Sequence, residues 1–398
     1  MRSDCEITIE LKKKGGIVID LKSKVKTLYG ESIETQCRGM MDFFKIPHAF
    51  VKIDDSGALP LVIAARIEAA VRQLTGTQSE YLPAMLDVNR YTTSPDRFRF
   101  SRLYLPGNTP SLMINAGLHS ADGIILDLED SVAPSKKDEA RILVRNALRH
   151  IDFRGAERMV RINQGERGLE DLHFTIPHNV NLILIPKCET PDQVKTVDKE
   201  IIEIKRKNKL KDPVYLMPII ESALGVENSF AIAKSSGNIV ALAIGLEDLT
   251  ADLGVTRTDE GKESLYARTR LVNAARAAGI QPIDSVFSDV GDLEALRQYV
   301  LLSKALGFEG MGCIHPRQIH VVQRGFAPDE AEIEKAKKII LAFKDAKSQG
   351  MGVVSLGTKM IDPPVVARAQ KTINLAVKLG KVSDNWINEI PPVDKQTI

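Results

Sequence analysis

Apolar runs bounded by polar residues recur eight times between about residue 100 and residue 330. Most are nearly continuous, which is typical of strands buried on both faces of a parallel sheet. Segments with a helical pattern, such as 136–149, 191–207 and 264–278, separate them. Eight such strands alternating with helices predict a (β/α)8 TIM barrel rather than a doubly wound sheet. The runs cover residues 102–106, 123–127, 159–163, 181–186, 214–221, 239–246, 281–286 and 310–315.

Polar side chains stand where these runs end. In a (β/α)8 barrel the chemistry takes place at the carboxyl ends of the strands, so these side chains would face one cavity. Each alone could cap a helix or neutralise a neighbour, but charges of both signs at so many strand ends favour a site for a divalent metal and a polycarboxylate. The residues are Asn108, Asp127, Glu129, Asp130, Arg161, Asn163, Lys187, Glu221, Asp248, Asp284 and His315.

Two consecutive runs each end in a carboxylate. Glu221 closes the run that begins at Val214, and Glu247 and Asp248 close the run that begins at Ile239. Mg²⁺ takes one or two carboxylates and completes its octahedron with water and substrate oxygens, so Glu221 and Asp248 are its predicted ligands. The alternative is that both carboxylates only stabilise the positive end of the next helix.

Residues 1–76 predict a small α+β domain in the order β-β-α-β-α. The first two strands alternate in polarity around a lysine- and glycine-rich turn, which predicts a hairpin. Ser56 or Asp55 is the predicted N-cap of the last helix. The predicted elements are strands at 5–11, 16–21 and 49–53 and helices at 25–44 and 58–74.

Three further segments complete the predicted organisation. Residues 77–99 lack periodicity and predict a linker, which as a random coil would span about 25 Å. Residues 100–330 form the barrel domain, and residues 331–398 a helical extension and tail. Within the extension we expect helices at 328–348 and 365–379 and a loop at 350–357. Asp362 stands as the N-cap of a helix begun by proline.

Three arginines, Arg97, Arg99 and Arg102, stand where the linker enters the barrel region. They are either solvated side chains or phosphate contacts.

Composition excludes several classes of partner. The net charge of +2 gives no reason to expect a nucleic acid, and no apolar run approaches the roughly 18 residues that span a membrane. The N-terminus lacks the apolar core of a secretory signal. Four widely spaced cysteines, Cys5, Cys37, Cys188 and Cys313, form no CxxC pair, so we expect free thiols in a cytoplasmic protein.

Nine short motifs follow one another along the barrel region and the extension, beginning at Leu105, Leu126, Val160, Leu184, Ile220, Gly245, His315, Gly352 and Lys359. In these motifs the chain resembles the beta subunit of citrate lyase, in the HpcH/HpaI aldolase superfamily. The resemblance implies Mg²⁺ held by Glu221 and Asp248, and Arg161 gripping the substrate and steadying enolate charge. Lys187, Glu129 and Asp127 would contact the substrate. Asp362 would act as an acid or base in a neighbouring subunit, which implies a homo-oligomer.

Four short segments characterise the first 76 residues: Ser3-Asp4, Tyr29-Gly30-Glu31, residues 54–59 and residues 64–69. They carry a resemblance to the acyl carrier (gamma) subunit of citrate lyase. It implies a phosphoribosyl-dephospho-coenzyme A arm on a serine ahead of the first strand. Ser3 is the candidate, although it stands one place from the family position, and Ser56 is the alternative. An unmodified carrier domain is the third interpretation.

Together these resemblances imply a lyase that cleaves a citryl thioester to oxaloacetate and an acetyl thioester. An acyl-transferase subunit would load the carrier. A lyase for malyl- or citramalyl-coenzyme A would share the same fold and metal site. A scaffold or carrier subunit of a citrate lyase complex is the alternative without catalysis.

Overall fold

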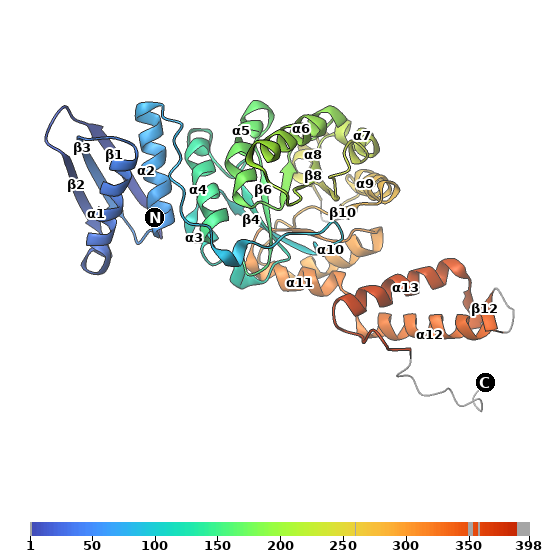
Figure 1. The fold of residues 1–398 in the computed structure, drawn as a ribbon. Coiled ribbons are helices and arrows are strands. Elements are labelled where there is room, and N and C mark those ends of the chain that lie inside the picture. Colours follow the sequence, from blue (N-terminus) through green and yellow to red (C-terminus); the bar gives the residue numbers. More distant parts are fainter. Residues whose placement is uncertain (1, 259, 349–352, 357–358, 388–398) are drawn as a thin grey trace. The chain divides into compact units, whose positions relative to one another are not determined.

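The computed structural model describes residues 2–258, 260–348, 353–356 and 359–387. Its contacts divide the chain into two compact units, Met1–Val322 and Gln323–Ile398. The first unit contains both the small N-terminal domain and the barrel (Figure 1). The segment boundaries predicted from the sequence, at residues 76, 99 and 330, remain predictions.

The N-terminal domain has the predicted element types but not the predicted hairpin. β1 and β2 do not pair with each other; β3 lies between them, antiparallel to β1 and parallel to β2. The helix between β2 and β3 makes a crossover that returns the chain parallel to β2, so the free edge of β2 receives β3. The elements are β1 (Cys5–Leu11), β2 (Ile17–Ser23), α1 (Lys26–Phe43), β3 (Ala49–Asp55) and α2 (Pro60–Thr75).

The predicted cap of α2 is also wrong. Leu59 occupies the N-cap position without a side-chain cap, and proline begins the helix. Asp55 instead accepts hydrogen bonds from the backbone N–H groups of Gly57 and Ala58, at 3.0 and 2.7 Å. The carboxylate therefore stabilises the turn before the helix.

The (β/α)8 barrel is confirmed. Eight parallel strands follow the order β10-β9-β8-β7-β6-β5-β4-β11, and a parallel bridge between Asp284 and Met311 joins the two ends of the sheet. All eight predicted runs contain a strand. The strands are β4 (Ser101–Pro106), β5 (Gly123–Asp127), β6 (Glu157–Arg161), β7 (Leu182–Ile185), β8 (Tyr215–Ile220), β9 (Ala241–Ile244), β10 (Gln281–Ile283) and β11 (Met311–Cys313).

Helices surround the strands (Figure 1). The longer ones are α4 (Lys137–His150), α5 (Gly165–Thr175), α6 (Pro191–Asn208), α7 (Ala223–Ala233), α9 (Leu265–Ala278), α10 (Leu293–Leu306) and α11 (Pro316–Phe326). The shorter ones are α3 (Pro110–Met113), α8 (Leu246–Asp252) and the 3-10 turns η1 (Asp87–Asn89), η2 (Ala116–His119), η3 (Pro134–Lys136) and η4 (Ile176–His178).

Apolar side chains from alternate strand positions fill the barrel interior. Leu182 and Leu184 of β7, and Met217 and Ile219 of β8, belong to one buried cluster. Arg102 of β4 is 1% exposed, and its guanidinium donates to the Met217 sulfur at 3.0 Å. Its Nε has no hydrogen-bond partner, and burial lowers its pKa. The interpretation of Arg102 as a solvated side chain is therefore wrong, whereas a phosphate contact stays a prediction, since Arg102 also lines the pocket described below.

Replacing this buried charge should stabilise the barrel. We expect Arg102→Met to raise the free energy of unfolding by about 1–3 kcal/mol, because a buried, poorly paired charge is replaced by an apolar chain of similar length. Urea denaturation measures the change, with the exposed Arg297→Met as control. A less stable Arg102→Met protein would mean that the guanidinium contributes net stability.

The N-terminal domain is docked on the barrel through buried charges. Glu68 of α2 and Arg145 of α4 are both 0% exposed and form two hydrogen bonds, of 2.8 and 2.7 Å. Arg72 also donates to Glu68, and Asn146 of α4 donates to the carbonyl oxygen of Leu61 at 3.0 Å. Helices α2 and α4 therefore lie side by side (Figure 1).

The predicted linker runs along the barrel rather than free in solvent. Leu86 donates its N–H to the Arg149 carbonyl, and Asn89, which is fully buried, donates to the Ile151 carbonyl. At its end Arg99 pairs with Glu157, with both side chains fully buried. These contacts therefore hold residues 77–99 against the barrel.

The second unit is described by itself. It contains α12 (Glu330–Ser348), β12 (Val354–Leu356), β13 (Lys359–Ile361) and α13 (Pro363–Lys378), with β12 antiparallel to β13. The expected loop at 350–357 is wrong for residues 354–356, which pair as a strand; residues 350–352 and 357 lie outside the described residues. Asp362 caps α13 by accepting from the Val365 N–H at 3.1 Å. Among the described helices, none is long and apolar enough to cross a membrane.

Candidate active site

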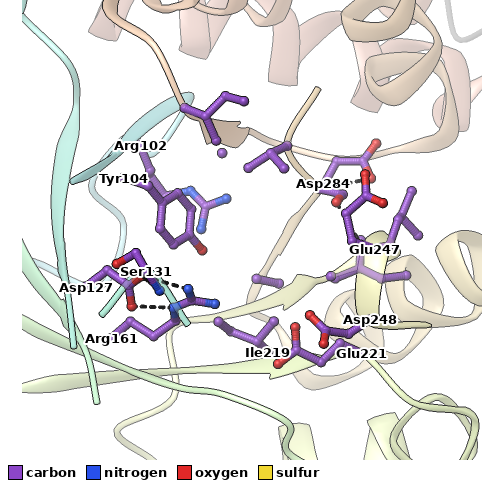
Figure 2. A pocket seen from close by; sticks show the side chains of 18 of the residues that line it. Arg102, Tyr104, Asp127, Ser131, Arg161, Ile219, Glu221, Glu247, Asp248 and Asp284 are labelled. Atoms are coloured by element: carbon purple, nitrogen blue, oxygen red, sulfur yellow. Dashed lines mark hydrogen bonds and ion pairs between the residues drawn. The ribbon is translucent and has the colours of Figure 1, made fainter. Parts of the chain in front are cut away.

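A pocket of about 350 Å³ opens at the carboxyl ends of the barrel strands. Figure 2 shows its two sides: Arg161 faces Asp127 and Ser131 on one, and Glu221 lies beside Asp248 on the other. These side chains come from β5 and the loop after it, from β6, from the residue directly after β8 and from α8, which follows β9. The parallel strands therefore bring together residues that lie as far as 121 positions apart, from Asp127 to Asp248.

Arg161, the last residue of β6, is held by carboxylates of the preceding strand, β5, and of the loop that follows it. Its Nε and one Nη each lie 2.7 Å from an oxygen of Asp127, and its other Nη lies 3.2 Å from Glu129. Burial works against the charge, but the hydrogen bonds and the charge of Asp127 raise the pKa of Arg161 overall. The Tyr104 ring lies 5.5 Å from the guanidinium carbon. Arg161 is thus a fixed, permanently charged donor at the pocket wall.

Lys187 connects the two sides of the pocket. Its Nζ lies 3.2 Å from Glu129 Oε1 and 3.5 Å from Asp248 Oδ1. Its backbone adopts a left-handed φ of 46°, which is uncommon for a residue with a side chain. In this conformation its N–H donates to Glu221 Oε1 at 2.6 Å. A single residue, Lys187, therefore does two things: its N–H orients the carboxylate of Glu221, and its ammonium group lies opposite Asp248.

Glu221 is the more buried of the two predicted metal ligands. It is 4% exposed, and burial, with repulsion from Asp248, raises its pKa to about 7. The Asp248 side chain is 40% exposed. Gly245 makes room for Glu221, because a Cβ built on Gly245 would lie 2.3 Å from Glu221 Oε2.

These residues fit a hard divalent cation. A buried carboxylate that is costly to ionise, beside a second carboxylate open to solvent, suits an ion that supplies positive charge and keeps water ligands. Over the described residues, no group of three or more His, Cys, Asp or Glu side chains could hold a metal. A two-carboxylate site is what Mg²⁺ accepts, whereas structural Zn²⁺ sites use four protein ligands.

Gly245→Ala should weaken metal binding. The new methyl group would push the Glu221 carboxylate away, so we expect the affinity for Mg²⁺ or Mn²⁺ to fall at least about tenfold, as displaced supporting groups do in metal sites. Titration calorimetry with Mn²⁺ measures this. Gly237→Ala is the control, since nothing lies within 4 Å of a Cβ there. Unchanged affinity in Gly245→Ala would exclude Glu221 as a ligand.

Several predicted rim residues have other partners. Asp284 is 1% exposed and pairs with Arg268 and Ser303, although it still lines the pocket. Asn163 donates to Asp171 at 2.7 Å, and His315 accepts from the Arg317 N–H at the start of α11. Asp362 belongs to the second unit.

Three residues in or beside the site were not predicted from the sequence: Tyr104, Gln164 and Lys137. Tyr104 lies within β4, two residues before its end, and lines the pocket. Gln164 donates to Glu129 Oε1 at 3.0 Å, and Lys137 donates to the backbone carbonyls of Leu128 and Glu129. The alternation of β4, which turns Arg102 and Tyr104 to the same side, was the one available signal.

The cysteines are free, as predicted, and all four are buried. Burial raises the pKa of Cys188 to about 12 and that of Cys37 to about 11, so neither carries a thiolate near neutral pH. Ser3 is half-buried: it has a left-handed φ of 55°, and its N–H donates to the Ser56 carbonyl at 3.2 Å. Both candidate attachment serines therefore lie at the same end of the domain.

Comparison with known proteins identifies the family. The family model described as HpcH/HpaI aldolase/citrate lyase matches residues 101–316. The chain belongs to this family. A second family model, labelled ACP and described as the malonate decarboxylase delta subunit, matches residues 2–74, which confirms the acyl-carrier resemblance of the N-terminal domain.

Relatives within the family differ in their named substrates. Citrate lyase subunit beta of Leuconostoc mesenteroides is 38% identical over 71% of this chain and 94% of its own. Human mitochondrial citramalyl-CoA lyase is 35% identical over 70% of this chain and 85% of its own. The structure of Mycobacterium tuberculosis CitE with magnesium, acetoacetate and coenzyme A matches with a TM-score of 0.59 and 28% identity, covering 70% of this chain and 98% of that one.

Proposed function

We propose that this protein is a Mg²⁺-dependent lyase that cleaves a citryl thioester to oxaloacetate and an acetyl thioester. The observation that carries the proposal is the placement of Glu221 beside Asp248 across one pocket from Arg161. Mg²⁺ in the CitE structure and the name of the Leuconostoc relative support the metal and the acyl group.

The reaction needs no redox partner. The hydroxyl group of the citryl substrate loses its proton, and its C–O bond becomes the ketone of oxaloacetate. The bond between the hydroxyl-bearing carbon and the methylene next to the thioester breaks, and its electron pair passes to the thioester as an enolate. Protonation of that methylene carbon gives the acetyl thioester, so atoms and charge balance.

The chain's own residues bind and orient the substrate in this proposal. Mg²⁺, when bound by Glu221 and Asp248, supplies Lewis acidity toward substrate oxygens. Arg161 donates to a substrate carboxylate or to the thioester oxygen, where negative charge develops. Asp127 and Glu129 hold Arg161 and Lys187 in place, and Lys187 offers a second cation to the polycarboxylate.

Proton transfer is assigned to Asp362 of a neighbouring copy. The role follows from the motif that begins at Lys359, and it makes the protein a homo-oligomer in which each site is completed in trans. The free, buried cysteines are compatible with the reducing cytoplasm, where we place the protein.

Three thioesters distinguish the candidate substrates. Citryl-, citramalyl- and malyl-coenzyme A would release oxaloacetate, pyruvate and glyoxylate, respectively. We expect kcat/KM with Mg²⁺ to be at least about tenfold higher for citryl-coenzyme A, since only the citryl group has a second free carboxylate that can accept from Arg161 or Lys187. Preference for citramalyl-coenzyme A would support the activity named in the human relative. If none of the three thioesters is cleaved, the remaining interpretation is a scaffold or carrier subunit without catalysis.

The N-terminal domain is proposed to carry the thioester arm on Ser3, loaded by a separate acyl-transferase subunit. Intact-mass spectrometry of protein from its native host tests this, and an adduct of phosphoribosyl-dephospho-coenzyme A mapped to Ser3 is the expected result. An adduct on Ser56 would move the attachment site. An unmodified chain would leave coenzyme A thioesters as the substrates.

A further inference from the structure

The active-site pocket reaches an arginine inside the barrel. Arg102 stands near the start of β4, which ends at Pro106, yet it lines the same pocket as Arg161 and Glu221. Figure 2 shows its guanidinium beside the Tyr104 ring, pointing toward the centre of the pocket. Because the side chain is almost completely buried, the guanidinium forms the inner end of the pocket rather than part of its rim.

Glycines on both neighbouring strands leave room at this depth. Arg102 pairs in register with Gly123 of β5 on one side and with Gly312 of β11 on the other. A Cβ built on Gly123 would lie 3.5 Å from Arg102 Cγ, and one built on Gly312 would lie 3.1 Å from Tyr104 Cε2. Side chains at these two positions would crowd Arg102 and Tyr104, so the glycines let the pocket extend into the barrel.

The Arg102 guanidinium has little to offset its charge. It donates to the Met217 sulfur at 3.0 Å, its Nε has no hydrogen-bond partner, and over the residues that the structure describes no carboxylate forms an ion pair with it. Met217 lies on β8, four strands from β4 in the sheet, so the arginine side chain reaches across the barrel interior. A buried charge without a counter-charge is costly, and an anion in the pocket would supply the missing partner.

The other two cations of the pocket are already paired with protein carboxylates. Arg161 lies 2.7 Å from Asp127, and Lys187 lies 3.2 Å from Glu129. A substrate carboxylate that binds either cation shares it with that protein carboxylate. A carboxylate that binds Arg102 meets an unpaired guanidinium in apolar surroundings, where a charge-assisted hydrogen bond is strongest.

We propose that Arg102 binds the second free carboxylate of the substrate, the one on the methylene arm that becomes part of oxaloacetate. The inference rests on the proposed function and assigns the residue that distinguishes a citryl thioester from its smaller analogues. A citramalyl group carries a methyl group in place of that arm, and a malyl group carries a hydrogen atom. Neither supplies an anion to the inner end of the pocket, so the buried guanidinium stays unpaired in their complexes and selects against them.

Binding of two keto acids isolates this carboxylate. Oxaloacetate and pyruvate share the carboxylate next to the keto group, and only oxaloacetate has a second one. Titration calorimetry on the full chain at saturating Mg²⁺ measures both dissociation constants for the unaltered protein, Arg102→Met and Arg102→Lys. Arg297→Met, at an exposed residue of α10, is the matched control for the substitution.

We expect Arg102→Met to weaken oxaloacetate binding at least about tenfold, as loss of a charged hydrogen-bond partner does, and to leave pyruvate binding unchanged. Pyruvate binding also shows that the altered barrel is folded, since a merely structural role of Arg102 would weaken both ligands alike. Arg102→Lys should lie between the two proteins, because an ammonium group keeps the charge but lacks the planar fork of donors. Arg297→Met should bind both keto acids as the unaltered protein does.

Equal losses for both keto acids, undiminished oxaloacetate binding by Arg102→Met, or no oxaloacetate binding by the unaltered protein would overturn the assignment. Cleavage of citryl-coenzyme A separates it from the proposed function. If Arg102→Met cleaves this thioester with the kcat/KM of the unaltered protein, only the role of Arg102 is wrong. If Arg102 governs oxaloacetate binding but no thioester is cleaved, the proposed lyase is wrong and the carboxylate site stands.

Discussion

Glu221→Gln should lower kcat for thioester cleavage by about 1000-fold or more, the order of effect that loss of a key electrostatic group produces in an active site. The amide keeps the shape of the side chain and removes the negative charge beside Asp248. It also replaces a carboxylate oxygen that accepts from the Lys187 N–H. Metal affinity and activity should therefore fall together. Oxaloacetate release over a Mg²⁺ titration measures both.

Glu227→Gln is the matched control for this change. Glu227 is exposed on α7, where it accepts from the Tyr266 hydroxyl, and it lies outside the pocket lining. The control should keep the activity of the unaltered protein. A Glu221→Gln protein with the same activity and the same Mg²⁺ dependence as its control would remove Glu221 from the site.

Arg145→Met should destabilise the first unit by about 3 kcal/mol, because it leaves the fully buried Glu68 without its bidentate partner. Arg72 and the Tyr81 N–H still reach Glu68, which keeps the loss at the lower end of the usual range. Urea denaturation measures the stability. Proteolysis within residues 77–99 should accelerate as docking weakens.

A double-mutant cycle separates the pair from the general effect of substitution. Glu68→Met combined with Arg145→Met replaces the buried ion pair by apolar chains, and the double change should cost less than half of the two single costs added together. Arg297→Met, at an exposed residue of α10, is the surface control. Additive losses would mean that Glu68 and Arg145 do not stabilise each other.

The sequence predicted the barrel because its strands are buried on both faces. Burial of that kind leaves a nearly continuous apolar run, as in residues 181–186, and such runs are visible without tertiary information. The polar residues at or near the end of each run were visible for the same reason. Asp127, Arg161, Lys187, Glu221 and Asp248 were found in this way, and the pocket brings all of them near one another.

The errors arose where the partner is distant in sequence. The alternation of residues 5–11 and 16–21 reveals two half-buried strands but not that β3 will lie between them. Arg99 could not be assigned because Glu157, its buried partner, lies 58 residues away. The docking of Glu68 on Arg145, 77 residues apart, is of the same kind.

The most direct test of the account is the time course of oxaloacetate release from citryl-coenzyme A by metal-free protein. We predict no release above the uncatalysed rate without metal. Added Mg²⁺ should restore full cleavage, with one acetyl-coenzyme A formed for each oxaloacetate. Cleavage at full rate in the metal-free protein, or no cleavage with saturating Mg²⁺, would contradict the assignment of this pocket as a Mg²⁺-dependent citryl-thioester lyase.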